Sequence, residues 1–348
     1  MSDEARSAAG AGVKKRASRL PFLDWTRGLA AFIMLQGHTF HSFLRPELRD
    51  TGTYIISQFV GGIAPAIFLF LTGVTLAFLM HRLERQRLPR IDRVIAALRR
   101  AGYLFALAFA FRFQLWLFAW PQSPWTDLLR VDILNCMGVG LAAVACLAAL
   151  TNEQRVHAGV VVGLLIACAA PLIPSPDPNS TPNLLQAYFA PDYRYFSFFP
   201  WASFVGFGVS GGAILRQVPT TESVYMHRTM QWAAIIGFGL VISAQYFSNL
   251  PYSLYSSTDF WLNSPGLVLI KVGIILLLLS LAFLWTHHGA GQGWSWVRLL
   301  GTNSLLVYWV HIELVYGRWF GYWKERLTLT QCAIASLVLI MAMIGLAE

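Results

Sequence analysis

The first long apolar segment of the chain, residues 21–43, contains four side chains that can ionise or exchange protons, namely Asp24, Arg27, His38 and His41. Because ionisable groups are costly inside a helix of membrane length, they usually face a cavity or a partner. On a helix of about 3.6 residues per turn, Arg27 and His38 return almost to the same face, and His41 follows about one turn later. The spacing therefore predicts one polar stripe along this segment.

The side chains of this stripe are suited to proton and anion chemistry. An imidazole titrates near about pH 6.5 and can accept a proton from an attacking hydroxyl or amine. A guanidinium can pair with a phosphate, or with a carboxylate such as that of Asp24. Along the helix, Arg27 and His38 are separated by a rise of about 16 Å. A structural interpretation stays open, in which Arg27 reaches the inner headgroups and His38 only hydrogen-bonds another helix.

Five further polar residues interrupt later apolar segments and are candidate substrate contacts. Arg112 lies in the third segment, and Asp132 and Asn135 begin the fourth. An Arg112–Asp132 pair would neutralise two costly charges, or it could form part of an acceptor pocket. Lys271, in the eighth segment, could snorkel to the membrane surface or line a cavity. His311, in the ninth, is either a second polar contact or a satisfied core histidine.

About ten apolar segments carry these residues, and they reach or approach the roughly 20 residues that cross a bilayer core. They lie near 21–43, 54–80, 100–120, 131–150, 156–174, 198–216, 230–248, 265–286, 302–320 and 329–347. A backbone in lipid must satisfy its own hydrogen bonds, and runs this long do so as helices rather than barrel strands. The sequence predicts an all-α polytopic membrane protein with a bundle of about ten transmembrane helices.

Composition and charge agree with this class. Of the 348 residues, 56% are hydrophobic and 12% are charged, whereas about 25% are charged in a soluble domain. The net charge of +9 lies mostly in short segments beside apolar runs, such as His81–Arg100. This is the positive-inside pattern of cytoplasmic loops and not a nucleic-acid surface. It predicts a cytoplasmic N-terminus, and it predicts no nucleic-acid partner.

Motifs for metals and nucleotides are missing from the sequence. The four cysteines match neither a zinc site nor a CxxC pair, and no HExxH or P-loop is present. The pair His287–His288 follows the eighth segment and is assigned to a solvated loop. The sequence therefore predicts no metal site.

Several segments resemble a known family. The spacing from Arg27 to His38 forms R-x10-H, which looks like the signature of integral-membrane acyltransferases that acylate sugars and cell-envelope polymers. The chain is also similar, over most of its length and in the same order, to the heparan-α-glucosaminide N-acetyltransferase-like family. The similar segments are LDWTRGLAAFIMLQGH, FLFLTGVTLAF, VDILNCMGVGL, FFPWASFVGFGVSGGAIL and LGTNSLLVYWVHIELV.

The resemblance implies a donor and a set of roles. Acetyl-CoA, or another acyl-CoA, would enter from the cytoplasm, and a sugar-like acceptor on the far side would receive the acyl group. His38 would act as the base, with His41 as a second catalytic candidate, and Arg27 with Asp24 would lie at the donor site. The lysosomal enzyme has an asparagine where His38 aligns and a histidine further along. Segment 42–54 here has none, so the heparan substrate is not carried over.

Residues 1–19 are predicted as a basic cytoplasmic segment and residues 20–348 as a single transmembrane acyltransferase-like domain of a bacterial-type, inner-membrane protein. Its expected partners are membrane lipids and a small-molecule or lipid-linked glycan acceptor. A homodimer is left open. The choice between direct transfer and an acyl-histidine intermediate is also left open.

The rival function is a secondary transporter of a small polar or sugar-like solute, for which intramembrane charges are also expected. Transporters often contain matching halves with broken helices, and no such match is found. A non-catalytic scaffold would not explain the polar stripe.

Overall fold

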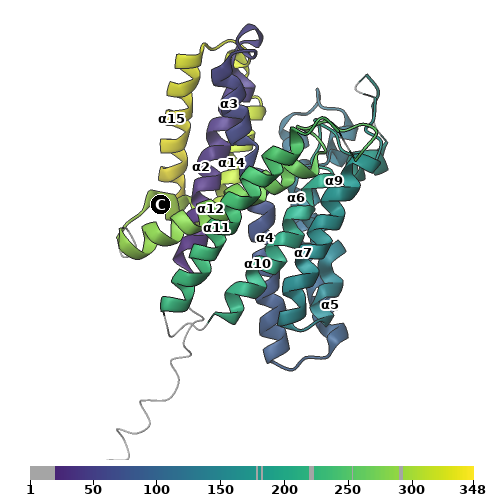
Figure 1. Ribbon diagram of the computed structural model, residues 1–348. Coiled ribbons are helices and arrows are strands. Elements are labelled where there is room, and N and C mark those ends of the chain that lie inside the picture. Colours follow the sequence, from purple (N-terminus) through teal and green to yellow (C-terminus); the bar gives the residue numbers. More distant parts are fainter. Residues whose placement is uncertain (1–19, 178, 182, 219–222, 253, 290–292) are drawn as a thin grey trace, which may run out of the picture.

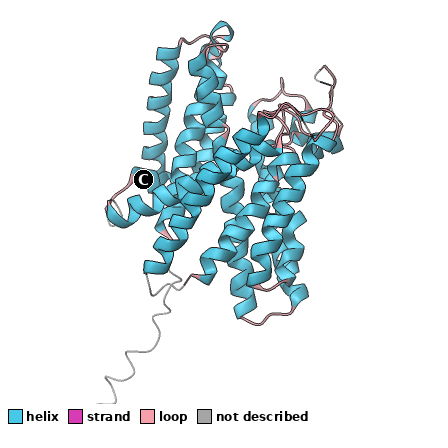
Figure 2. Cartoon of the chain, in the orientation of Figure 1, coloured by secondary structure: helices cyan, strands magenta, loops and turns pink. Residues whose placement is uncertain are grey.

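The computed structural model of the chain describes residues 20–348 except 178, 182, 219–222, 253 and 290–292. The predicted N-terminal segment 1–19 lies outside the described residues. The described part is built from helices and contains no strand, as Figure 2 shows. This confirms the prediction of an all-α protein.

The helices follow the predicted apolar segments closely. In chain order the α-helices are α2 (Pro21–Phe43), α3 (Gly52–Gly61), α4 (Ile63–Arg85), α5 (Arg90–Phe118), α6 (Ile133–Val144), α7 (Asn152–Ala169), α8 (Leu184–Phe189), α9 (Phe198–Trp201), α10 (Ser203–Gln217), α11 (Ser223–Ser248), α12 (Pro265–His288), α13 (Trp296–Thr302), α14 (Ser304–Tyr316) and α15 (Leu329–Ala347). Short 3₁₀ helices are η2 (Pro46–Leu48), η3 (Trp125–Leu129), η4 (Ala145–Ala149), η5 (Ala170–Leu172) and η6 (Gly321–Trp323).

Membrane-spanning helices make up most of the described chain. Eight helical segments within it are long and apolar enough to cross a bilayer: Gly52–Arg85, Arg90–Phe118, Trp125–Ala149, Asn152–Leu172, Phe198–Gln217, Val224–Ser248, Pro265–His288 and Leu329–Ala347. The other two predicted spans differ from these. Helix α2 has the length, at 23 residues, but carries the polar stripe. Helix α14 has 13 residues, because it begins near the predicted start but ends at Tyr316, before Gly317. The chain is therefore a multi-pass membrane protein.

Helix α2 is in contact with α3, α4, α12, α13, α14 and α15. Figure 1 shows α2 beside α14 and α15. Two glycines permit the close crossing of α2 and α13: a Cβ at Gly28 would lie 1.7 Å from the carbonyl oxygen of Val297, and one at Gly301 would lie 1.9 Å from that of Asp24. Small residues at such crossings let helices approach in lipid, where the hydrophobic effect between helices is weak. The polar stripe of α2 is thereby fixed inside the bundle.

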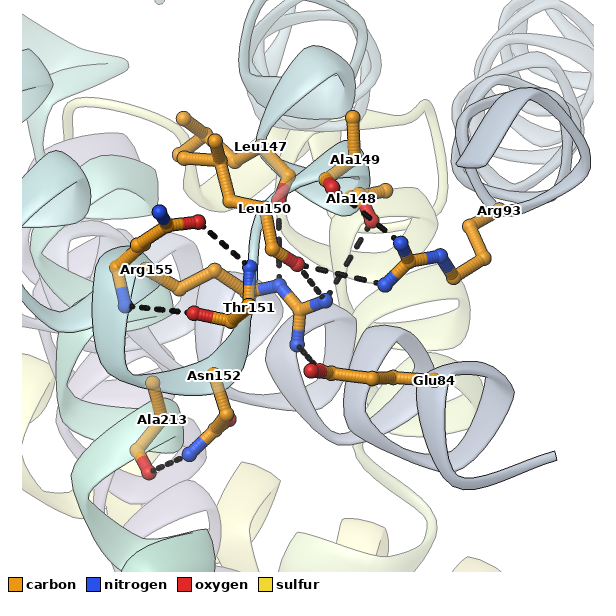
Figure 3. A network of polar contacts seen from close by, with 11 residues as sticks. Glu84, Arg93, Leu147, Ala148, Ala149, Leu150, Thr151, Asn152, Arg155 and Ala213 are labelled. Atoms are coloured by element: carbon orange, nitrogen blue, oxygen red, sulfur yellow. Dashed lines mark hydrogen bonds and ion pairs between the residues drawn. The ribbon is translucent and has the colours of Figure 1, made fainter. Parts of the chain in front are cut away.

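One end of the bundle carries the turn between α4 and α5, residues 86–89, and we call it the basic end because arginines flank this turn. The positive-inside pattern predicts that it faces the cytoplasm. Near this end Arg155, a fully buried residue of α7, forms an ion pair of 2.8 Å with Glu84 of α4. Figure 3 shows this pair together with Arg93 of α5.

The two arginines of Figure 3 also satisfy the carbonyl groups where η4 ends. Arg155 donates hydrogen bonds to the carbonyl oxygens of Leu147, Ala148 and Leu150, and Arg93 donates to those of Ala149 and Leu150. Buried carbonyls left without donors would be destabilising. The network therefore joins α4, α5 and α7, and Arg93 has a structural role in addition to its contribution to the positive charge of segment His81–Arg100.

Candidate functional site

A cavity of about 1620 Å³ lies among α2, α4, α5, α12 and α14. Six of the predicted site residues line it: Arg27, His38, His41, Arg112, Asp132 and Lys271. The other three, Asp24, Asn135 and His311, are buried behind the wall and contact lining residues. A site for one small molecule usually measures roughly 300–1,000 Å³. This cavity is therefore large enough for two substrates.

His38 and His311 form a pair of imidazoles across α2 and α14. The Nδ1 atom of His38 lies 2.9 Å from the Nε2 atom of His311. Their rings are nearly parallel, with centroids 5.2 Å apart and 16° between the planes. His311 is fully buried, and its Nδ1 atom lies 2.8 Å from the carbonyl oxygen of Val307. His311, for which the sequence left a polar contact or a core histidine open, is a partner of His38.

These contacts fix the proton positions in the neutral pair. A carbonyl oxygen only accepts hydrogen bonds, so His311 Nδ1 must carry the hydrogen that it donates to Val307. A neutral imidazole has one donor and one acceptor nitrogen, so His311 Nε2 is the acceptor. His38 Nδ1 therefore donates to His311 Nε2. The remaining nitrogen of His38, Nε2, holds a lone pair and can accept a proton.

His41 occupies the rim of the cavity, at the end of α2 away from the basic end. Its side chain is exposed, and its Nδ1 atom lies 3.4 Å from the hydroxyl oxygen of Tyr54. The ring of Tyr316 contacts both His41 and His38, with centroid distances of 6.2 and 5.3 Å. Arg49 donates to the His41 carbonyl oxygen and forms an ion pair of 2.9 Å with Glu325. His41 thus has contacts of its own, with Tyr54 and Tyr316.

Arg27 lies on α2, in the part of the helix nearer the basic end of the bundle. It forms an ion pair of 3.2 Å with Asp24. The cavity wall also includes Thr75 of α4 and Arg100 of α5. All three lining residues belong to the half of their helix that is nearer the basic end. The cavity thus presents cations and hydroxyls toward the predicted cytoplasmic side and an imidazole further along α2.

Arg112 and Asp132 form an ion pair of 3.1 Å, and both line the cavity. Asp132 also caps α6, because its carboxylate accepts hydrogen bonds from the backbone N–H groups of Leu134 and Asn135. Asn135 donates from its side-chain amide to the hydroxyl of Tyr188, at 2.9 Å. The predicted pair is therefore present and borders the cavity as well, while Asn135 supports it from behind.

Lys271 lies on the cavity wall, with 9% of the residue exposed. Its Nζ atom is 4.6 Å from the ring centroid of Trp201, within the range of a cation–π contact. Of the two interpretations that the sequence left open, the structure contains the one in which Lys271 lines the cavity.

The sequence model of the family described as heparan-alpha-glucosaminide N-acetyltransferase, catalytic, matches residues 19–243. The chain belongs to this family. A comparison with curated proteins gives no match. The matched region contains Arg27, His38, Arg112 and Asp132, whereas Lys271 and His311 lie beyond it.

Membership in the heparan-alpha-glucosaminide N-acetyltransferase catalytic family implies a membrane acetyltransferase-like function, and in general acetyl-CoA as the donor.

Sequence reasoning did not assign Glu313 to the site, although it lines the cavity. Its carboxylate accepts hydrogen bonds from the side chains of Gln114 and Trp319, each at 3.2 Å. A carboxylate within an apolar segment is itself a signal of a functional position. The tyrosines Tyr54 and Tyr316 were also missed, and no signal separates them from the many aromatic residues of membrane helices.

A loop between α8 and α9 adds charged groups to the cavity wall. Burial disfavours ionisation of Asp192, but hydrogen bonds from the side chain and backbone of Arg194 outweigh this effect and lower the pKa of the carboxyl group. In the loop after α14, burial lowers the pKa of Lys324, another lining residue. The wall therefore carries charges of both signs away from the basic end.

Proposed function

We propose that this protein is an integral-membrane acyltransferase that moves the acetyl group of cytoplasmic acetyl-CoA to a sugar-like acceptor, with His38 as the base. The observation that carries this proposal is the hydrogen bond between His38 and His311 in the wall of a two-substrate cavity. Family membership supports the reaction class. The remaining roles are argued from the positions of lining residues.

The His38 imidazole has the proton state that a general base needs. As the acceptor's oxygen or nitrogen forms a bond to the thioester carbonyl carbon, its proton passes to His38 Nε2. The carbon–sulfur bond then breaks, and the departing thiolate takes up that proton from His38. While His38 is charged, His311 accepts the hydrogen bond from Nδ1 and holds the ring in place, much as a carboxylate does in a catalytic triad.

His311 is accordingly a positioning residue, and replacing it should affect turnover more than substrate binding. We expect His311→Leu to lower kcat about 10–100-fold, the usual loss when an orienting partner is removed, with KM for both substrates nearly unchanged. His311→Gln, whose side-chain oxygen can still accept from His38, should restore part of kcat. Steady-state kinetics of both variants tests this. An unchanged kcat in His311→Leu would contradict the role.

The basic end suits the donor. Acetyl-CoA carries phosphates, and guanidinium groups bind phosphate oxygens through paired charge-assisted hydrogen bonds. Arg27 and Arg100 line this part of the cavity. Arg27 lies about 16 Å along α2 from His38. Asp24 orients Arg27 through their ion pair. The donor would thus enter with its thioester directed toward His38.

Removing one donor-side cation should weaken acetyl-CoA binding without changing the chemistry. We expect Arg27→Gln and Arg100→Gln each to raise KM for acetyl-CoA about tenfold or more, because a hydrogen bond to a charged group contributes about 1.5–3 kcal/mol, and to leave kcat nearly unchanged. Lys324→Gln, a lining residue away from the basic end, is the matched control and should leave this KM unchanged. Equal effects of all three changes would argue against a donor site at Arg27 and Arg100.

The other part of the cavity suits a polar acceptor. It offers the Arg112–Asp132 pair, Lys271 beside Trp201, and Tyr54 at the rim. Charged groups and hydroxyls can hydrogen-bond sugar hydroxyls, and aromatic rings can pack against a sugar face. Asn135 holds Asp132 in place from behind. We therefore propose a small or lipid-linked glycan as the acceptor.

The proposed setting is a cell inner membrane, with the basic end and residues 1–19 in the cytoplasm and residues 20–348 as one catalytic domain. An experiment in vesicles tests both the orientation of the protein across the bilayer and the transfer reaction. The purified protein is placed in sealed proteoliposomes, its orientation is established by chemical labelling of Cys146 and Cys168, both exposed, and radiolabelled acetyl-CoA is supplied on one side only. Label should pass to an impermeant acceptor on the opposite side when acetyl-CoA is at the basic end. Transfer only between substrates on the same side would contradict the proposal.

A further inference from the structure

Three histidines from two helices meet away from the acyl-transfer cavity. His227 lies near the start of α11, and His287 and His288 form the last turn of α12. Helices α11 and α12 pack side by side, as Figure 1 shows. The sequence assigned His287–His288 to a loop, and this was wrong: α12 continues to His288 and ends at Gly289, whose N–H donates to the carbonyl oxygen of Trp285 at 2.9 Å.

The nitrogen atoms of these three imidazoles lie close enough to share a ligand. One nitrogen from each ring can be chosen so that all three lie within 4.8 Å of one another. The ring of His287 lies 4.6 Å from that of His227 and 4.7 Å from that of His288, measured between centroids. In both pairs the planes are inclined by 79°. This is a cluster from two separate helices and not a local histidine run.

The hydrogen bonding of His288 points to metal binding. Its Nδ1 atom lies 3.3 Å from the carbonyl oxygen of Leu284. Because a carbonyl only accepts, Nδ1 carries the hydrogen and Nε2 keeps its lone pair. A metal-bound histidine usually donates its other ring N–H to a carbonyl or carboxylate in this way. The contact therefore presents His288 Nε2 as a ligand.

Phe283 helps to position the other two rings. It is a buried residue of α12, stacked on His287 with 8° between the planes and a centroid distance of 5.6 Å. It meets His227 edge to face at 4.9 Å. The cluster also lies at the C-terminal end of α12, where the helix dipole favours a cation.

We propose that His227, His287 and His288 bind one divalent transition metal ion of the zinc class, with three imidazole ligands and an open fourth position. Imidazole nitrogens are ligands for zinc, copper and nickel ions, and three histidines are a known zinc ligand set. A tetrahedral zinc ion with Zn–N bonds of about 2.0–2.1 Å brings its nitrogens to roughly 3.4 Å from one another. A small rotation of the exposed His287 side chain can shorten the separation from 4.8 Å.

The bound ion would join the start of α11 to the end of α12. None of the three histidines lines the acyl-transfer cavity, so the site is independent of the proposed reaction. Helix α12 also carries Lys271 on the cavity wall. The metal would therefore restrain a helix that contributes to the acceptor end, without contacting either substrate.

The test uses the full-length protein with a tag that contains no histidine. The protein is stripped with EDTA, dialysed against Zn²⁺, and assayed for bound zinc by mass spectrometry and for affinity by calorimetry. We expect one zinc ion per chain, and a loss of affinity of at least about 10–100-fold in His227→Ala, His287→Ala and His288→Ala, since even losing an orienting partner costs this much. His157→Ala, which removes an exposed histidine of α7, should bind like wild type.

Either of two results would overturn the site: no zinc binding by the wild-type protein, or wild-type affinity in any of the three histidine variants. Thermal melting without metal checks that each variant is folded. His287 and His288 are exposed, so their replacement should leave the metal-free melting temperature unchanged. Because the readout is zinc binding, failure of the metal site leaves the acyltransfer proposal untouched, and the reverse also holds.

Discussion

Replacement of His38 by glutamine is expected to lower kcat for acyl transfer by about 10²–10⁴-fold, the usual contribution of a positioned general base. Glutamine keeps a polar group of similar size on α2 but cannot take the acceptor's proton. Binding of acetyl-CoA should persist, because the proposed donor contacts are at Arg27 and Arg100. Single-turnover kinetics with saturating acetyl-CoA would measure this loss directly.

The matched control for His38 is His41→Gln, one turn further along the same helix. His41 is exposed at the cavity rim, and its side chain has a different hydrogen-bond partner, Tyr54. We expect a much smaller loss of kcat in this variant. If His41→Gln abolished turnover while His38→Gln retained it, His41 would be the base, and the His38–His311 pair would be a structural contact.

The largest loss of stability is expected from replacing Arg155 by methionine. Arg155 is fully buried, pairs with Glu84 at 2.8 Å and donates to three carbonyl oxygens near η4. Removing one partner of a buried ion pair typically costs about 3–5 kcal/mol, because the other charge is left without compensation. Arg155→Met should therefore lower the free energy of unfolding in detergent micelles by about this amount, measured by denaturant titration.

Two comparisons separate the ion pair from a general effect of lost charge. Arg99→Met removes an exposed arginine of α5 and should change stability by less than about 0.5 kcal/mol. The double variant Arg155→Met with Glu84→Leu removes the stranded carboxylate and should recover part of the loss. Equal destabilisation by Arg155→Met and Arg99→Met would contradict the role given to the network of Figure 3.

The helices were largely predictable from the sequence because long apolar runs in lipid must form helices. The predicted first segment, 21–43, has the bounds of α2, and the stripe from Arg27 to His41 does line one cavity. Helix α14 begins at Ser304, beside the predicted start at 302, whereas the short helix α13 before it was not predicted. The asparagine between them, Asn303, indicates a helix cap. Whether a further helix precedes the cap depends on the tertiary structure.

The contacts between distant residues could not be read from spacing. His38 and His311 are 273 residues apart, so their pairing depends on how α14 packs on α2. The same holds for His227 with His287, which belong to different helices and to no short linear motif. The Arg112–Asp132 pair was predicted, because both charges had to be neutralised within neighbouring segments. The catalytic role of His38 and the substrate-binding roles of Arg112 and Asp132 remain predictions.

The most direct test of the account is a simultaneous measurement of both products with the purified wild-type protein in nanodiscs. Radiolabelled acetyl-CoA is supplied with a panel of amino sugars and glycans, and free CoA and labelled acceptor are counted together. We predict one labelled acceptor for each CoA released, with both products lost in His38→Gln. If acetyl-CoA is neither bound nor consumed across the full panel, and proteoliposomes instead accumulate a sugar-like solute, the protein is a transporter and the account is wrong.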